Sequence, residues 1–193
     1  CTSVREGEVT AANALVKLLR LQQMTSGRVT VETDTDSSLV KVDDAKEKAL
    51  VDLLTDLPAD EPVVIFGRFR ADIASAHAAA KAVGRASLEL SGQRRELKEW
   101  QQGVAPVLAV QIQSGGTGID LTRAAIVCFL STGFSLGDYE QALARNHRPG
   151  QTRNVSYYHF VARDTVDEQV YGALRARKQV VEAVLDGIHR GDA

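Results

Sequence analysis

The chain has 193 residues, of which 44% are hydrophobic and 25% are charged, and its formal net charge is −2. This composition is ordinary for a globular protein with one domain of about 130–150 residues and a helical extension. No apolar run approaches the roughly 20 residues that span a bilayer, and no signal-peptide pattern opens the chain. The sequence therefore indicates neither a membrane protein nor a secreted one, and we expect an intracellular location, such as the cytoplasm.

The first 61 residues are predicted to form a helical lead-in and a linker. Apolar residues recur at helical spacing over residues 8–24, whereas the polar stretch 25–42 favours a loop or a short hairpin. A second helix is expected over 43–56, before two prolines that bracket a turn. We therefore expect the lead-in, residues 1–61, to pack on a main domain formed by residues 62–193.

From residue 62 onward, short apolar runs alternate with helical patterns. Strands are expected at 63–66, 86–90, 107–112, 125–130 and 155–161, and helices between them at 71–83, 93–102 and 136–147. Near-continuous Val, Ile and Leu runs joined by helices predict an α/β fold with a parallel sheet covered on both faces. Ligands of such sheets bind at the carboxyl ends of the strands, where we expect the motifs described below.

Three further expectations concern single side chains. Cys128 lies inside an apolar strand and is predicted to be a reduced core residue, and Trp100 is predicted to be a core aromatic. A capping box is predicted to start the last helix, with Thr165 as the cap and Glu168 reaching back to it. The four histidines are scattered along the chain, so no metal site is predicted.

A glycine-rich segment, residues 113–122, follows the third predicted strand. Small residues let a backbone come close to phosphates or to a DNA strand, and their N–H groups donate the hydrogen bonds. Taken alone, the Gly-Gly-x-Gly pattern is also typical of a plain tight turn. Asp120 adds specificity, because a carboxylate one turn later can accept a hydrogen bond from a ribose hydroxyl.

The stretch from Gln141 to Gln151 reads Gln-Ala-Leu-Ala-Arg-Asn-His-Arg-Pro-Gly-Gln. It places Arg145 and Arg148 on one face at the end of a predicted helix, where two guanidiniums can grip a polyphosphate and neutralise charge during phosphoryl transfer. An exposed basic helix end is the structural alternative. Residues 62–190 carry 16 Lys/Arg against 12 Asp/Glu, and residues 1–61 carry 7 against 12, so the basic excess lies with the motifs.

In this order, the two segments resemble motifs V and VI of superfamily 2 helicases. The closest similarity is to the Swi/Snf-type DNA translocases, whose motif VI reads Gln-x-x-x-Arg-x-His-Arg-x-Gly-Gln. Residues 63–70 resemble motif IV, and residues 15–24 resemble the segment that precedes the second lobe in this family. The resemblance implies a RecA-like three-layer fold, a parallel sheet with helices on both faces, preceded by a helical extension.

The resemblance also implies roles for individual residues. Arg148 matches the family's arginine finger and forms the catalytic pair with Arg145. Nucleotide contacts are implied for Gly118, Asp120, Gln141, Arg145 and Arg148. DNA-backbone contacts are implied for Arg68, Ser91, Gly92, Gln113, Ser114, Gly115, Gly116 and Thr122. The chain departs from the family at Asp120, because Swi/Snf-type proteins usually carry Asn there and DEAD-box helicases carry Asp. Ser91 and Gly92 are expected to begin a helix whose free N–H groups suit a phosphate.

The implied function is the second motor lobe of an ATP-dependent DNA helicase or translocase. No P-loop and no acidic magnesium motif occur in these 193 residues, and the family carries both on the first lobe. The cofactor that the resemblance implies is ATP with Mg²⁺, and the Mg²⁺ ligands are expected on the first lobe. The expected partners are duplex DNA, bound through its phosphates, and the N-terminal RecA-like lobe. The chain alone is expected to be inactive as an ATPase.

Two other functions stay open. A stand-alone nucleotide or dinucleotide enzyme is disfavoured because no Gly-x-Gly-x-x-Gly follows the first strand of the sheet. A non-catalytic nucleic-acid or protein-interaction module with a helicase-like fold is disfavoured by the intact Arg145, Arg148 and Gln151. An Arg148→Ala change separates these alternatives, because it abolishes ATP turnover only in a motor.

Overall fold

A five-stranded parallel sheet forms the centre of the computed structural model, which describes residues 11–32, 37–114 and 118–191. The strand order is β4-β5-β3-β6-β7. The strands are β3 (Val63–Gly67), β4 (Ser87–Leu90), β5 (Val107–Gln111), β6 (Ile126–Phe129) and β7 (Ser156–His159). The predicted α/β class and its parallel sheet are confirmed, and every predicted strand lies within two residues of its observed bounds.

Helices cover both faces of the sheet because alternate strand residues point to opposite sides. Leu50, Ile65 and Ala109 belong to the core on the face covered by α2 (Ala45–Asp56) and α3 (Arg70–Ala82). The core on the other face lies beneath α4 (Leu97–Gln101), the 3₁₀ turn η1 (Ile112–Ser114) and α5 (Leu136–Ala144). Trp100 and Cys128 are fully buried, and Cys128 is a free thiol, as predicted.

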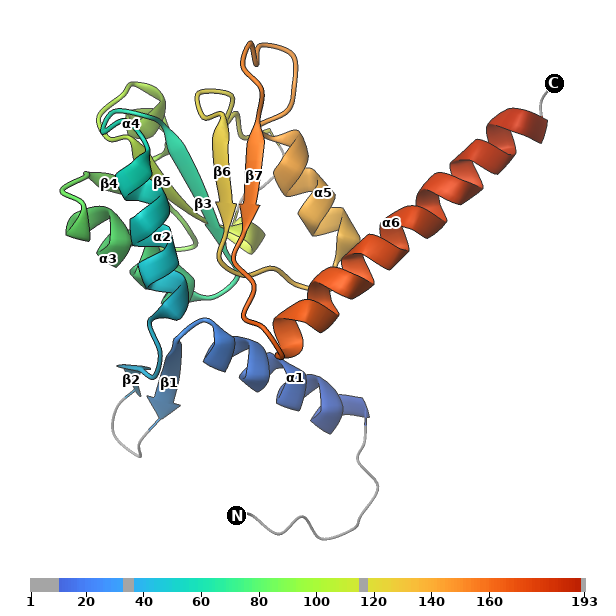
Figure 1. Ribbon diagram of the computed structural model, residues 1–193, viewed down its shortest axis with the longest axis horizontal. Helices are drawn as coiled ribbons and strands as arrows, with labels where there is room; N and C mark the ends of the chain where they lie inside the picture. The colour runs from blue at the N-terminus through green and yellow to red at the C-terminus, as the bar shows by residue number, and fades with distance from the viewer. Residues whose placement is uncertain (1–10, 33–36, 115–117, 192–193) are drawn as a thin grey trace, which may run out of the picture.

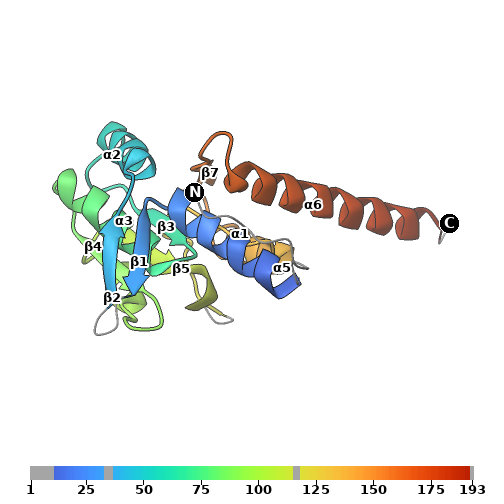
Figure 2. The ribbon, with the colours of Figure 1, turned by 90° about the horizontal axis from the view of Figure 1, so that it is seen from below.

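The described first part of the lead-in, before α2, lies across the carboxyl end of the sheet (Figures 1 and 2). It consists of α1 (Ala11–Thr25) and a hairpin of β1 (Arg28–Glu32) and β2 (Ser37–Lys41). α2 shares the core of the sheet through Leu50 and Leu54. The domain boundary at residue 62 stays a prediction.

The last helix, α6 (Val166–Gly191), starts beside α1 and extends away from the sheet (Figures 1 and 2). The capping box predicted at the start of α6 has the expected residue, Thr165, at one position but a different residue at the other. Thr165 Oγ accepts a hydrogen bond from Asp167 N, and it is the carboxylate of Asp167, rather than Glu168, that reaches back, to Ala162 N. None of the helices in the described part of the chain is both long and apolar enough to cross a membrane.

Two predicted helices are shorter than expected because other hydrogen bonds compete for the backbone at their ends, from a local side chain in one helix and from a distant backbone N–H group in the other. The helix expected from residue 93 begins only at Leu97, after a turn in which Ser91 Oγ accepts hydrogen bonds from Gln93 N and Arg94 N. The helix expected to reach residue 147 ends at Ala144. There the carbonyl of the next residue, Arg145, accepts a hydrogen bond from another segment instead of continuing the helix.

Candidate nucleotide and nucleic-acid site

The two main sequence motifs meet in space, in a unit that we call the junction, formed by residues 119–124 and 145–151. Leu121 N donates to Arg145 O at 3.2 Å, and Asn146 Nδ2 donates to Leu121 O at 3.0 Å. Gln151 Nε2 donates to Thr122 O at 2.9 Å. Since Asn146 is fully buried, these bonds are shielded from water and hold the two motifs together as one unit.

The junction lies at the amino ends of β6 and β7, so its predicted place at the carboxyl ends is wrong. Gln151 Nε2 also donates to Ala124 O, just before β6, and Tyr157 Oη in β7 donates to Leu143 O at 3.1 Å. The cause is the path of α5, which follows β6 and runs back along the sheet, so the chain that leaves it returns to the amino ends. Only the start of the glycine segment lies at the carboxyl end of β5.

The two arginines of the junction differ in exposure. Arg145 is 5% exposed, its Nη2 donates to Gln141 Oε1 at 2.9 Å, and burial lowers its pKa while the charge of Asp138 raises it. Arg148 is exposed, and its Nη1 makes a long contact of 3.4 Å with Ile119 O. The prediction that both guanidiniums share one helix face is wrong, because α5 ends before Arg145 and Arg148 lies in the following turn.

Asp120 lies beside Arg148 in the junction. Its Oδ1 accepts hydrogen bonds from Thr122 N at 2.9 Å and from Thr122 Oγ1 at 2.7 Å. These bonds, with a contribution from the charge of Arg148, lower the pKa of Asp120, so the carboxylate is ionised near neutral pH. Gly118, which precedes it, is exposed and has a φ of +100°, a backbone conformation that favours glycine. The predicted nucleotide residues Gly118, Asp120 and Arg148 therefore lie on or next to one surface turn.

Most of the predicted DNA contacts gather at the opposite end of the sheet. A cavity of about 420 Å³ is lined by Arg68 and Gln113, and a neighbouring one of about 440 Å³ is lined by Ser91 and Gly92. The two cavities share Arg70 and Gln111 as lining residues, so they adjoin at the carboxyl ends of β3, β4 and β5. A Cβ atom on Gly92 would lie 3.9 Å from Ser114 Oγ, which places Ser114 in the same group.

Three predicted DNA contacts stand apart from this group. Gly115 and Gly116 lie outside the described residues. Thr122 belongs to the junction, where its hydroxyl donates to Asp120. The prediction that Ser91 begins a helix with free N–H groups is also wrong. The helix begins only at Leu97, and the Ser91 hydroxyl already accepts a hydrogen bond from Gln93 N.

One side chain at this end of the sheet was not among the residues predicted from the sequence. Gln22 of α1 is 3% exposed, and it accepts a hydrogen bond from Arg68 Nη1 and donates one to Thr132 O. The available signal was its position four residues after Leu18, on the face of the helix that turns inward.

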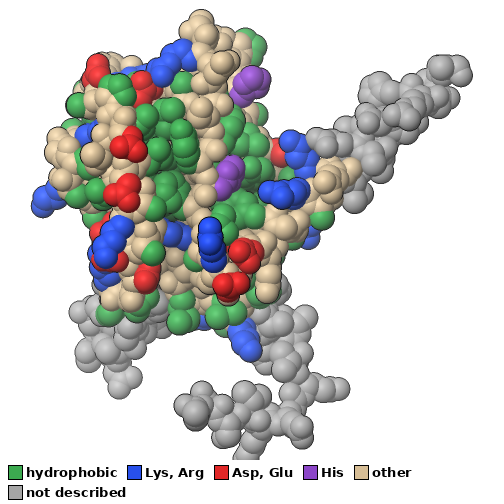
Figure 3. Space-filling view, viewed as in Figure 1, with side chains coloured by type: hydrophobic (Ala, Val, Ile, Leu, Met, Phe, Trp, Pro, Cys, Tyr) green, Lys and Arg blue, Asp and Glu red, His purple; other side chains and the backbone are tan. Residues whose placement is uncertain are grey.

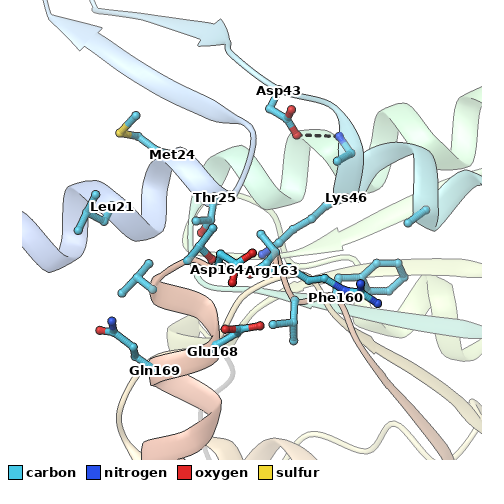
Figure 4. Close-up of a pocket in the computed structure, with 16 residues that line it drawn as sticks. Leu21, Met24, Thr25, Asp43, Lys46, Phe160, Arg163, Asp164, Glu168 and Gln169 are labelled. Atoms are coloured by element: carbon cyan, nitrogen blue, oxygen red, sulfur yellow. Dashed lines mark hydrogen bonds between the residues drawn. The ribbon is translucent and has the colours of Figure 1, made fainter.

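A larger cavity of about 1110 Å³ lies between α1, the start of α2 and the segment that leads into α6. Figure 4 shows Thr25 at the end of α1 and Lys46 reaching from α2 toward the start of α6. Apolar Leu21 and Phe160 line this cavity together with charged side chains such as Glu168. None of the predicted site residues lines it. On the face seen in Figure 3, acidic and basic side chains are intermixed.

Comparison with known proteins places this architecture among helicases. The family described as helicase conserved C-terminal domain matches residues 45–150. Protein p41 of Acyrthosiphon pisum secondary endosymbiont phage 1 is 26% identical over 96% of the chain and 40% of its own length. The chromodomain-helicase-DNA-binding protein 1-like of Mus musculus is 34% identical over 51% of the chain and 11% of its own length.

Two further comparisons agree with these. The chromatin-remodeling ATPase INO80 of Saccharomyces cerevisiae is 32% identical over 52% of the chain and 7% of its own length. The crystal structure of the C-terminal part of the Fun30 ATPase domain superposes with a TM-score of 0.58 at 26% identity, over 67% of this chain and 45% of that one. The chain thus spans less than half the length of each of these relatives.

Proposed function

Because this chain belongs to the helicase conserved C-terminal domain family and forms the C-terminal RecA-like lobe of a Swi/Snf-type ATPase, we propose that it supplies the arginine finger and the DNA-backbone contacts of a DNA translocase. The lobe acts together with an N-terminal RecA-like lobe that provides the P-loop and the Mg²⁺ ligands. Bound ATP supplies the phosphoryl group that is transferred to water. The expected location is intracellular, where the DNA is.

The observation that carries the proposal is the geometry of Arg148. Its guanidinium is exposed, one long contact to Ile119 O steadies it, and the ionised Asp120 lies beside it. A guanidinium has five N–H donors, so most of them are available for phosphate oxygens. Arg148 is therefore suited to stabilise charge on a terminal phosphate, and Asp120 to accept a hydrogen bond from a ribose hydroxyl.

Arg145 has a different task in this proposal. Its side chain is buried and contacts Gln141, and its backbone carbonyl holds Leu121. Arg145 stabilises the buried side of the junction, so that the turn that carries Arg148 is rigid when nucleotide binds. Pre-organised charges of this kind contribute more to catalysis than mobile ones, because they need no reorganisation at the moment of reaction.

The DNA contacts are proposed at the other end of the sheet. Arg68 and Gln113 line one cavity there, and Ser91 and Gly92 line the next. Contacts to phosphates carry little sequence information, so we expect binding to duplex DNA with slight sequence preference. We also expect affinity to fall with salt, by about 0.9 in log-log slope for each phosphate contacted.

The test is an Arg148→Ala change in the complete native protein, with Arg153→Ala as the matched control. Arg153 is an exposed arginine of the same surface loop and pairs with Glu61. DNA-stimulated ATP hydrolysis should fall by about 10³–10⁵ in kcat for Arg148→Ala and stay near the parent value for Arg153→Ala. DNA affinity should change little in both variants.

Two results would contradict the proposal. If turnover survives the Arg148→Ala change, the arginine-finger assignment fails. If the purified 193-residue chain alone hydrolyses ATP in response to DNA, the assignment as one lobe of a two-lobe motor fails, and an independent enzyme takes its place.

A further inference from the structure

A buried amide of the lead-in helix α1 contacts Arg68, one of the proposed DNA-binding residues. Gln22 lies in the last turns of α1 and is 3% exposed. Its Nε2 donates to Thr132 O at 3.1 Å, in the loop after β6, and its Oε1 accepts a hydrogen bond from Arg68 Nη1. One side chain thus links α1 to the loops at the carboxyl ends of both β3 and β6.

Arg68 is held from three directions. Its Nη1 donates a hydrogen bond to the amide oxygen of Gln22, its Cζ lies 5.3 Å from the centre of the Phe69 ring, and its backbone N–H donates to Ser131 Oγ at 2.9 Å. The side chain is half-buried, yet it lines the cavity of about 420 Å³ together with Gln113. A long arginine side chain loses much conformational freedom in such a setting, and that cost is met before any ligand binds.

The end of α1 is itself anchored to the rest of the molecule. Thr25 Oγ1 donates to Asp167 Oδ1 at 2.8 Å, and Asp167 pairs with Lys46 of α2 at 2.6 Å. Figure 4 shows Thr25 and Lys46 converging on the start of α6. Gln22 is therefore fixed on a firmly attached helix, three residues before that anchor, and its amide has a defined position relative to Arg68.

We propose that Gln22 is a positioning residue, which orients the Arg68 guanidinium toward a DNA phosphate at the carboxyl end of the sheet. This inference rests on the proposed DNA contact of Arg68. Gln22 acts through one N–H of Arg68 and leaves the others for phosphate oxygens. The lead-in helix thereby becomes part of the DNA-binding apparatus without touching DNA through this side chain.

The test is a double-mutant cycle on DNA affinity in the complete native protein, measured over a series of salt concentrations with a duplex of arbitrary sequence. The variants are Arg68→Ala, Gln22→Met and both together, with Gln169→Met as the control. Methionine keeps the length of glutamine without its hydrogen bonds, and Gln169 is an exposed glutamine on α6. Thermal unfolding checks that each variant is folded.

We expect Arg68→Ala to weaken binding about tenfold and to reduce the salt slope by about 0.9, the loss of one phosphate contact. Gln22→Met should reduce affinity and slope in the same direction, and it should have no further effect when Arg68 is already alanine. A merely structural role for Gln22 would leave the salt slope unchanged.

Each other outcome has a definite meaning. If Arg68→Ala has no effect on DNA affinity, the proposed DNA contact fails and the inference fails with it. If Arg68→Ala weakens binding but Gln22→Met does not, or if the two effects add, the contact stands and the positioning role is overturned. Should Gln22→Met unfold, Gln22→Glu decides in its place. It keeps the acceptor but adds a negative charge beside Arg68, so it must lower the salt slope for the inference to stand.

Discussion

Lys46 gives the sharpest test of what holds α2 to the start of α6. Its ammonium lies 2.6 Å from Asp167 Oδ2 and donates to Leu130 O at 2.7 Å. The two charged side chains are only 10% and 6% exposed. We predict that Lys46→Met strongly destabilises the protein, because it leaves the carboxylate of Asp167 buried without its cation.

The expected magnitude follows from the burial of the pair. Removing one partner of a buried ion pair costs about 3–5 kcal/mol, since the remaining charge is uncompensated. The whole free energy of unfolding of a domain is about 5–15 kcal/mol, so the loss is a large share. At about 2–4 °C per kcal/mol for a chain of this length, the melting temperature should fall by about 6–20 °C.

The assay is urea denaturation and calorimetry of Lys46→Met beside Lys48→Met. Lys48 lies on the same helix and pairs with Asp44 at 2.9 Å, but its side chain is 73% exposed. Exposed pairs contribute little, so Lys48→Met should leave the unfolding midpoint unchanged. Adding Asp167→Asn to Lys46→Met should recover part of the loss. Equal effects of the two lysine variants would refute the argument from burial.

Three other measurements test the packing. His159 is exposed, but stacking on Phe129 desolvates part of its ring and lowers its pKa. The neutral ring therefore gives the fold a small stability above about pH 6.5, which is lost as pH falls through the lower folded-state pKa. Denaturation measured between about pH 8 and pH 5 should show this loss of stability, and the His159→Phe variant should not show it. The same pH dependence in the parent and the variant would contradict the role of His159. Burial raises the pKa of Cys128 to about 12, so in a Cys1→Ala background a thiol reagent should react only on unfolding, and rapid labelling of folded protein would contradict this. Asn146→Ala should cost about 1–3 kcal/mol in the free energy of unfolding, against almost none for the exposed control Asn154→Ala, and equal losses would disprove the junction's buried bond.

The strands of the sheet could be predicted because each is short, apolar and bounded by turn residues. Val63–Gly67 is buried along its whole length, which is what a central parallel strand requires. The hairpin within 25–42 and the core positions of Trp100 and Cys128 followed from equally local signals. Periodicity in sequence reports burial directly, so these elements needed no knowledge of distant partners.

The ends of helices and the exposure of single arginines could not be predicted in the same way. α5 ends where Arg145 O and Asn146 turn to Leu121, more than twenty residues earlier in the chain. The same contacts bury Arg145 and leave Arg148 exposed, although both arginines contribute the same residue type to the motif. Gln22 is a partial case, since its spacing from Leu18 indicates the inward face of α1 but not its hydrogen-bond partners Arg68 and Thr132. Tertiary hydrogen bonds decided each of these positions.

α6 starts at the anchor formed by Thr25, Lys46 and Asp167, and its 26 residues extend for about 39 Å. Such a helix is a lever whose pivot lies at the anchor and whose other end extends away from the sheet (Figure 2). A rotation of about 10° at the pivot would carry the far end through about 7 Å. A small rearrangement among these three side chains that rotated the helix in this way would therefore displace its far end by about the length of a helical turn.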